Sequence, residues 1–110
     1  MKQKIAIQVE AGHQMGFGHL KRCLVLARKL KKNAEIIFIT QSKEVFTQVS
    51  KEKFKVVLLN KNKHFLNQIK QVLLKQKVDK IIIDLKEKVN KGYINDIKKI
   101  RVKTILLDNI

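Results

Sequence analysis

The 110 residues include no proline and no tryptophan, and they include only four glycines and one cysteine. A single cysteine, Cys23, cannot form an internal disulfide, and no Cys and His spacing typical of a zinc site occurs. No apolar run approaches the ~20 residues that cross a bilayer, and the stretch before Glu10 is too short for a signal peptide. We therefore expect a cytoplasmic protein with no disulfide, no metal, no cofactor and no membrane partner.

Acidic residues are also scarce: nine Asp and Glu against 25 Lys and Arg give a formal net charge of +16. Such a charge suggests a nucleic-acid-binding module, because cations release counterions from phosphates. However, only three of the basic residues are Arg, which phosphate and guanine recognition favours, and the lysines are scattered from Lys2 to Lys103. A compositional bias toward Lys and Ile explains the charge better. Nucleic acid is the less favoured partner, although the charge predicts attraction to anions such as a nucleotide diphosphate.

Short aliphatic runs alternate with amphipathic stretches along the whole chain. The runs predict strands at 4–9, 35–40, 55–59, 80–84 and 103–108. Helices are predicted between them, from Leu20, after an N-cap at Ser42, from His64 and from Tyr93. Because the strands are continuous aliphatic runs, both faces of the sheet should be covered. The order predicts an α/β fold over residues 1–110, a Rossmann-like parallel sheet of about five strands with covering helices.

Three of the four glycines fall in one short stretch, GHQMGFG at 12–18, between the first strand and the first helix. In such folds ligands bind beyond the carboxyl ends of the strands, and this loop lies at that edge. Gly16 and Gly18 would let a ligand approach the main chain closely, and the start of the helix is an anion site. The loop is therefore the expected place for a sugar or diphosphate group.

His19 falls at the start of the first helix, where the helix dipole disfavours a protonated imidazole. A neutral imidazole can take a proton from water, which is the work of a general base. The alternative is that His19 is only a polar residue in the first turn. Its flanking glycines at the functional edge favour the catalytic interpretation.

Two familiar phosphate-binding motifs are absent. The dinucleotide fingerprint needs a third glycine where Lys21 stands and an acidic residue where Thr40 ends the second strand. The Gly-Lys-Ser/Thr triplet of the P-loop does not occur either. A nicotinamide-dependent enzyme and a P-loop ATPase are thus excluded as first interpretations.

The segment MGFGHLKRCLVLARKL, at 15–30, resembles the N-terminal signature of the UDP-sugar hydrolases of pseudaminic acid biosynthesis. It is equally similar to related spore-coat polysaccharide biosynthesis proteins. That signature runs Ile-Gly-x-Gly-His-x-x-Arg-Cys-Leu-x-Leu-Ala. Met15 replaces the first aliphatic residue, and the matching positions are Gly16, Gly18, His19, Arg22, Cys23, Leu24, Leu26 and Ala27.

The resemblance implies the N-terminal half of a glycosyltransferase-B-type architecture, in which two Rossmann-like domains enclose the substrate. It implies that His19 activates water against the anomeric carbon of a UDP-linked amino sugar and that UDP leaves. It also implies that Gly16, Phe17 and Gly18 bind substrate, and that Arg22 either orients the loop or binds the phosphates. The uridine site would lie in a second domain or a partner chain, so that residues 1–110 alone would be an incomplete, nearly inactive unit. A glycosyltransferase of surface polysaccharide biosynthesis, which passes the sugar to an acceptor hydroxyl, remains the alternative.

The later part of the chain, at 79–109, resembles the same family at two strands that end in aspartate, Asp84 and Asp108. It departs from the family pattern at Lys86, where an aromatic residue is common, and at Asn109, where a second aspartate is expected. Asp84 and Asp108 are thus possible site residues, with strand capping as the alternative.

Two further residues lie in or near the loop. His13 lies within the loop and is a possible site residue, with an exposed loop position as its alternative. Cys23 occupies the apolar face of the helix, which predicts a core residue and not a nucleophile.

Overall fold

The computed structural model of the protein describes residues 2–10, 18–61, 64–84 and 91–107. Strands and helices alternate strictly along these ranges, as the sequence predicts. The elements are β1 (Gln3–Val9), α1 (Gly18–Leu30), β2 (Ala34–Thr40), α2 (Lys43–Lys51), β3 (Lys55–Leu58), α3 (Phe65–Lys75), β4 (Lys80–Asp84), α4 (Lys91–Lys99) and β5 (Lys103–Leu106). Four of the candidate site residues lie outside the described ranges: His13, Gly16, Phe17 and Asp108.

The strands form one parallel sheet in the order β3-β2-β1-β4-β5. Between β3 and β4 the chain therefore crosses from the edge strand β3 to the far side of β1. As a result β1 lies at the centre, with Val9 opposite Asp84 on β4 and Gln8 opposite Ile39 on β2. This register brings the carboxyl ends of β1, β2 and β4 together at one edge, where the sequence places the functional residues.

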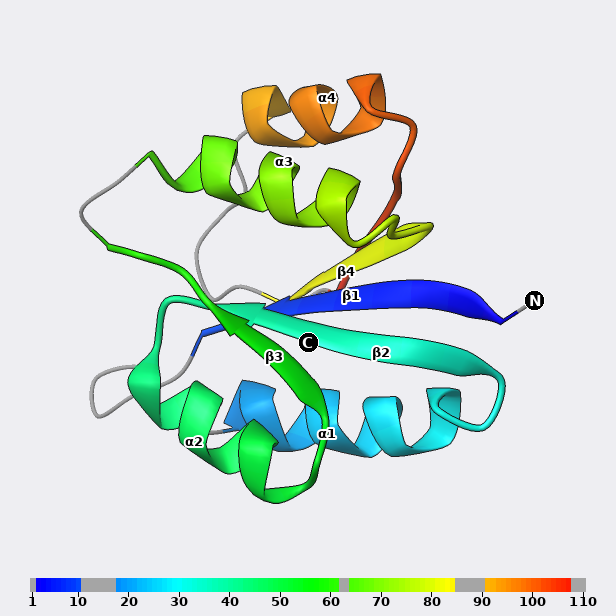
Figure 1. The fold of residues 1–110 in the computed structure, drawn as a ribbon, viewed down its shortest axis with the longest axis vertical. Helices are drawn as coiled ribbons and strands as arrows, with labels where there is room; N and C mark the ends of the chain where they lie inside the picture. Colours follow the sequence, from blue (N-terminus) through cyan, green and yellow to red (C-terminus); the bar gives the residue numbers. More distant parts are fainter. Residues whose placement is uncertain (1, 11–17, 62–63, 85–90, 108–110) are drawn as a thin grey trace.

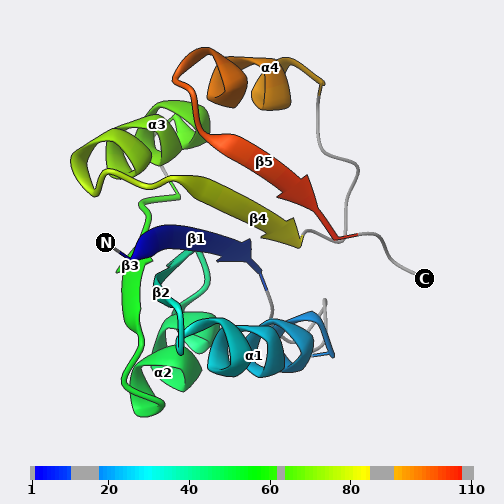
Figure 2. The same ribbon diagram turned by 90° about the vertical axis from the view of Figure 1, so that its right-hand side faces the viewer.

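Helices cover both faces of the sheet, which confirms the prediction from the continuous aliphatic strands (Figures 1 and 2). In Figure 1, α1 and α2 lie below the sheet, and α3 and α4 lie above it. Successive side chains of β1 point to opposite faces of the sheet. Ile5 and Ile7 pack in the hydrophobic cluster that includes α1 and α2, and Ala6 packs in the cluster that includes α3 and α4. The central strands are buried, whereas the edge strands β3 and β5 are partly exposed.

The shortage of glycine is visible where three of the helices end. The left-handed backbone conformation after α2, α3 and α4 is adopted by Lys53, Lys77 and Arg101, with φ of 65°, 55° and 63°. Glycine usually fills this place because it has no Cβ to crowd the backbone. After α3 the amide of Val78 still donates to the carbonyl of Leu73 at 3.0 Å, as in a Schellman motif. Hydrophobic residues that follow, such as Val78, anchor these turns in the core.

Within the described ranges, none of the helices combines the length and the apolar character that a bilayer crossing requires.

Candidate functional site

His19 is the second residue of α1 and lies at the carboxyl edge of the sheet, as the sequence predicts. Helix α1 begins at Gly18, where the space around a hypothetical Cβ is empty to 4 Å. The His19 side chain is 18% exposed, so the ring is neither buried in the apolar core nor free in solvent. It therefore stands where a ligand at the sheet edge could reach it.

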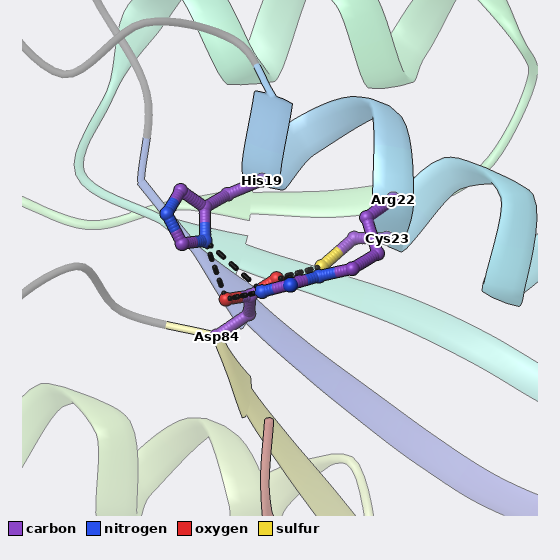
Figure 3. Close-up of polar contacts among 4 residues, drawn as sticks. All are labelled: His19, Arg22, Cys23 and Asp84. Atoms are coloured by element: carbon purple, nitrogen blue, oxygen red, sulfur yellow. Dashed lines mark hydrogen bonds and ion pairs between the residues drawn. The ribbon is translucent and has the colours of Figure 1, made fainter. Parts of the chain in front are cut away.

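The ring of His19 contacts the carboxylate of Asp84, which ends β4 on the neighbouring strand (Figure 3). His19 Nδ1 lies 2.7 Å from Asp84 Oδ1. Arg22 binds the same carboxylate side-on, with Nε 3.1 Å from Oδ2 and Nη2 2.6 Å from Oδ1. The thiol of Cys23 donates to Oδ2 at 3.3 Å. One fully buried carboxylate thus accepts hydrogen bonds from three side chains of the first turns of α1.

The spacing of these three residues explains how one helix supplies all the donors. Residues at i, i+3 and i+4 lie on the same face of an α-helix, and His19, Arg22 and Cys23 have that spacing. The face turns toward the sheet because Leu20, Cys23, Leu24 and Ala27 are buried against it. Packing of α1 therefore positions the donors over the end of β4.

The contact with Asp84 assigns the tautomer of His19. An ionised carboxylate only accepts hydrogen bonds, so at 2.7 Å the proton must lie on Nδ1. Arg22 Nη2 also approaches Nδ1, at 3.1 Å, but a protonated Nδ1 has no lone pair in the ring plane to accept from it. We therefore interpret this second approach as a close contact within the network. The Nε2 atom keeps its lone pair, as a general base requires.

Electrostatics in the network follow from its donors. Burial alone would raise the pKa of Asp84, but the hydrogen bonds from Arg22, His19 and Cys23 outweigh it and hold that pKa below its ordinary value. Burial, with the nearby Asp84 charge, raises the pKa of the Cys23 thiol far above its usual range. Asp84 is thus a carboxylate and Cys23 a permanent thiol, which supports the prediction that Cys23 is not a nucleophile.

A second carboxylate, Glu10, lies at the same edge just after β1. Both of its oxygens accept from the amide of Gln41, at 2.7 and 3.0 Å, and the Thr40 hydroxyl donates to Oε1. Thr40 in turn accepts from the amide of Ser42 at 3.0 Å. Burial raises the pKa of Glu10, and the hydrogen bonds from Thr40 and Gln41 offset that rise only in part. Glu10 thereby ties the end of β1 to the turn that follows β2.

The sequence predicts part of this arrangement. It places His19, Arg22 and Gly18 at the edge, and it leaves Asp84 open between a site residue and a strand cap. The structure brings Asp84 into direct contact with His19 and Arg22. The contact between Cys23 and Asp84 and the role of Glu10 are not predicted from the sequence. The signal for Glu10 was available, because it is an acidic residue directly after a buried strand at the functional edge.

Within the described ranges, His, Cys, Asp and Glu side chains form no cluster of three or more that could hold a metal ion. The donors around Asp84 are cationic or neutral N–H and S–H groups, which compete with a metal for the carboxylate. The arrangement instead suits proton transfer at His19 and the binding of an anion near the start of α1.

No family model matches the chain. It is similar to the uncharacterised protein MJ1062 of Methanocaldococcus jannaschii, with 37% identity over 109 residues. The match covers 96% of this chain and 22% of that protein, so this chain corresponds to about a fifth of the relative's length.

In structure the chain is similar to a glycosyltransferase from Rickettsia africae ESF-5, with a TM-score of 0.67 and 20% sequence identity. The similarity covers 99% of this chain and 31% of that crystal structure. It shows that this sheet and its helices adopt a fold that also occurs in a glycosyltransferase. The fold class predicted from the sequence is therefore confirmed.

Proposed function

We propose that the chain is the base-carrying part of an enzyme that transfers a glycosyl group from a nucleotide sugar to the hydroxyl of an acceptor. The contact between His19 Nδ1 and the buried carboxylate of Asp84 carries this proposal, because it leaves the Nε2 lone pair to take a proton. The glycosyltransferase fold of the structural neighbour supports the same class of reaction.

In this mechanism His19 Nε2 removes the proton from the attacking hydroxyl as its oxygen approaches the anomeric carbon. The C–O bond to the nucleotide breaks, and the nucleoside diphosphate leaves with the bonding electron pair. Asp84 stabilises the imidazolium that forms and keeps Nδ1 protonated throughout. The start of α1 offers backbone N–H groups to the diphosphate. The uridine site implied by the family resemblance would lie outside residues 1–110, in a second domain or a partner chain.

Hydrolysis of a UDP-linked amino sugar is the second candidate, with water in place of the acceptor. The signature over 15–30 favours it, since this segment resembles the UDP-sugar hydrolases residue by residue. The two reactions share the base, the leaving group and the sheet edge. They differ only in whether His19 deprotonates a water molecule or the hydroxyl of an acceptor.

The test is release of UDP from UDP-linked amino sugars by a protein that carries this chain together with its nucleotide-binding part. Release that requires an added sugar acceptor supports transfer, and release in water alone supports hydrolysis. His19→Ala should lower kcat by about 100-fold or more, since a positioned general base contributes roughly 10²–10⁴-fold.

Gln71, an exposed residue of α3, provides the control, because Gln71→Ala changes a polar side chain on a helix that covers the opposite face of the sheet from α1. It should leave kcat within about twofold. Unchanged UDP release by His19→Ala, or no release from any nucleotide sugar by the wild type, would contradict the proposal.

A further inference from the structure

We propose that Arg22 is a positioning residue and not a substrate ligand: its guanidinium, with the Cys23 thiol, locks the Asp84 carboxylate in the rotation that presents Oδ1 to His19 Nδ1. The family resemblance leaves Arg22 open between orienting the loop and binding phosphate, whereas the geometry points to a contact with Asp84 as its role. The catalytic consequence of this inference rests on the proposed function, but the geometric claim can be tested without it.

The donors of Arg22 are already engaged along one edge of the guanidinium. Nε lies 3.1 Å from Oδ2 and Nη2 lies 2.6 Å from Oδ1, a bidentate pair with the carboxylate of Asp84. Such a paired edge is also what an arginine offers to a phosphate. Arg22 therefore cannot offer this edge to a diphosphate unless it releases Asp84, whose buried charge would then lose its strongest donor.

The bidentate contact with Arg22 fixes the orientation of the Asp84 carboxylate as well as compensating its charge. Two parallel hydrogen bonds set the plane of the carboxylate, and a carboxylate held in that plane keeps Oδ1 2.7 Å from His19 Nδ1. A lysine supplies a point charge on a flexible stem and cannot set this rotation. Arg22 is thus the residue whose shape, and not only its charge, is required.

Cys23 adds a donor that neither solvent nor substrate can reach. Its side chain is fully buried, and Sγ lies 3.3 Å from Oδ2. Arg22, by contrast, is 41% exposed. When the guanidinium moves, the thiol keeps one hydrogen bond on Oδ2 and limits rotation of the carboxylate.

The test measures the ring tautomer of His19 in the 110-residue chain, by long-range ¹H–¹⁵N correlation at a pH where the ring is neutral. His13→Gln and His64→Gln spectra assign the three histidines. The wild type should show the Nδ1–H tautomer. Arg22→Lys should lower the ratio of Nδ1–H to Nε2–H by about tenfold, the effect of weakening a hydrogen bond to a charged group.

Variants at position 23 separate the hydrogen bond from packing. Cys23→Ala should lower the tautomer ratio by about threefold, and Cys23→Ser, which keeps a donor, should restore it. Leu24→Val is the control, because it opens a cavity in the same buried face of α1 without a polar group. It should lower Tm and leave the ratio unchanged.

An Arg22→Lys ratio within twofold of the wild type overturns the inference, and so does a Leu24→Val ratio that falls as far as that of Arg22→Lys. In the nucleotide-sugar assay, Arg22→Lys should lower kcat and leave KM within about twofold, because positioning acts on the chemical step. A rise in KM at unchanged kcat would instead identify a substrate ligand and also overturn it. If no nucleotide sugar is turned over, the proposed function fails while the tautomer measurement still decides the role of Arg22.

Discussion

Two carboxylates at the same edge of the sheet, the buried Asp84 and the partly buried Glu10, are held in different ways. Asp84 binds the cation of Arg22, the ring of His19 and the thiol of Cys23, and its pKa lies below the ordinary value. Glu10 binds a hydroxyl and backbone amides, and its pKa lies above the ordinary value.

The comparison separates the effect of burial from the effect of the partner. Burial disfavours the charged form of both side chains, and it is the largest single influence on each pKa. A guanidinium close to Asp84 reverses the outcome, whereas the neutral donors around Glu10 do not. Asp84 is therefore suited to keep a permanent charge beside His19, and Glu10 is suited to tie strands together.

The largest effect on stability is expected when the Asp84 and Glu10 carboxylates are neutralised in separate variants. Asp84→Asn turns an amide N–H toward the Arg22 and His19 donors, and we expect a loss of about 2 kcal/mol in the free energy of unfolding. This value is below that of a fully buried ion pair because Arg22 is 41% exposed and regains water. Glu10→Gln keeps one acceptor oxygen, which can still accept from Thr40 and Gln41, and it should cost less than about 1 kcal/mol. Urea unfolding at pH 7 measures both, and equal losses would erase the distinction.

The pH dependence of these two variants should have opposite signs. Because folding lowers the pKa of Asp84, its charge stabilises the fold above the ordinary value of about 4, and this stability is lost as the pH falls further. Folding raises the pKa of Glu10, so the Glu10 contribution becomes more favourable as the pH falls toward about 4.

Urea unfolding between pH 7 and pH 3 checks this expectation. The stability of the wild type relative to Asp84→Asn should shrink below about pH 4. The stability of the wild type relative to Glu10→Gln should increase as the pH falls from 7 to about 4. Parallel slopes for the two variants would show that the partners do not distinguish these carboxylates.

An intermediate effect is expected at the Thr40 hydroxyl, which donates to Glu10. Thr40→Val removes the donor to Glu10 and the acceptor for the Ser42 amide, in a fully buried position of similar volume. We expect a loss of about 1–2 kcal/mol, and a further rise in the pKa of Glu10. Thermal unfolding at pH 7 and at pH 5 measures the change, and Thr40→Ser, which keeps the hydroxyl, is the control. Equal Tm values for Thr40→Val and Thr40→Ser would show that the Thr40 hydroxyl does not stabilise the fold.

The fold could be predicted from the sequence because hydrophobic periodicity marks the strands and helices, and their alternation along the chain indicates a parallel sheet. The strand ending at Asp84 was predicted with its observed bounds, and the N-cap at Ser42 is confirmed by the Val45 amide, 3.2 Å from the Ser42 hydroxyl. The last strand ends at Leu106, which is earlier than predicted. The helix predicted from Tyr93 begins at Lys91, since local propensity leaves the first turn of a helix poorly determined.

The site was only partly predictable, because its contacts join residues far apart in the chain. The glycines and His19 mark the loop locally, but the pairing of His19 with Asp84 depends on the placement of β4 beside β1. Cys23 packs in the apolar core and also donates a hydrogen bond to Asp84. Its position on the apolar face of the helix predicts the packing but not the hydrogen bond.

The placement of β1 at the centre of the sheet has a consequence for folding. His19 and Asp84 are 65 positions apart, and they meet only when β4 has docked on the side of β1 that β2 leaves open. Long-range parallel pairing of this kind is slow to form, because a large loop must close before any contact rewards it. On a ribosome, the imidazole of His19 would emerge without its carboxylate until β4 had been synthesised. The paired form of the ring is therefore a late product of folding and a marker that β4 has docked beside β1.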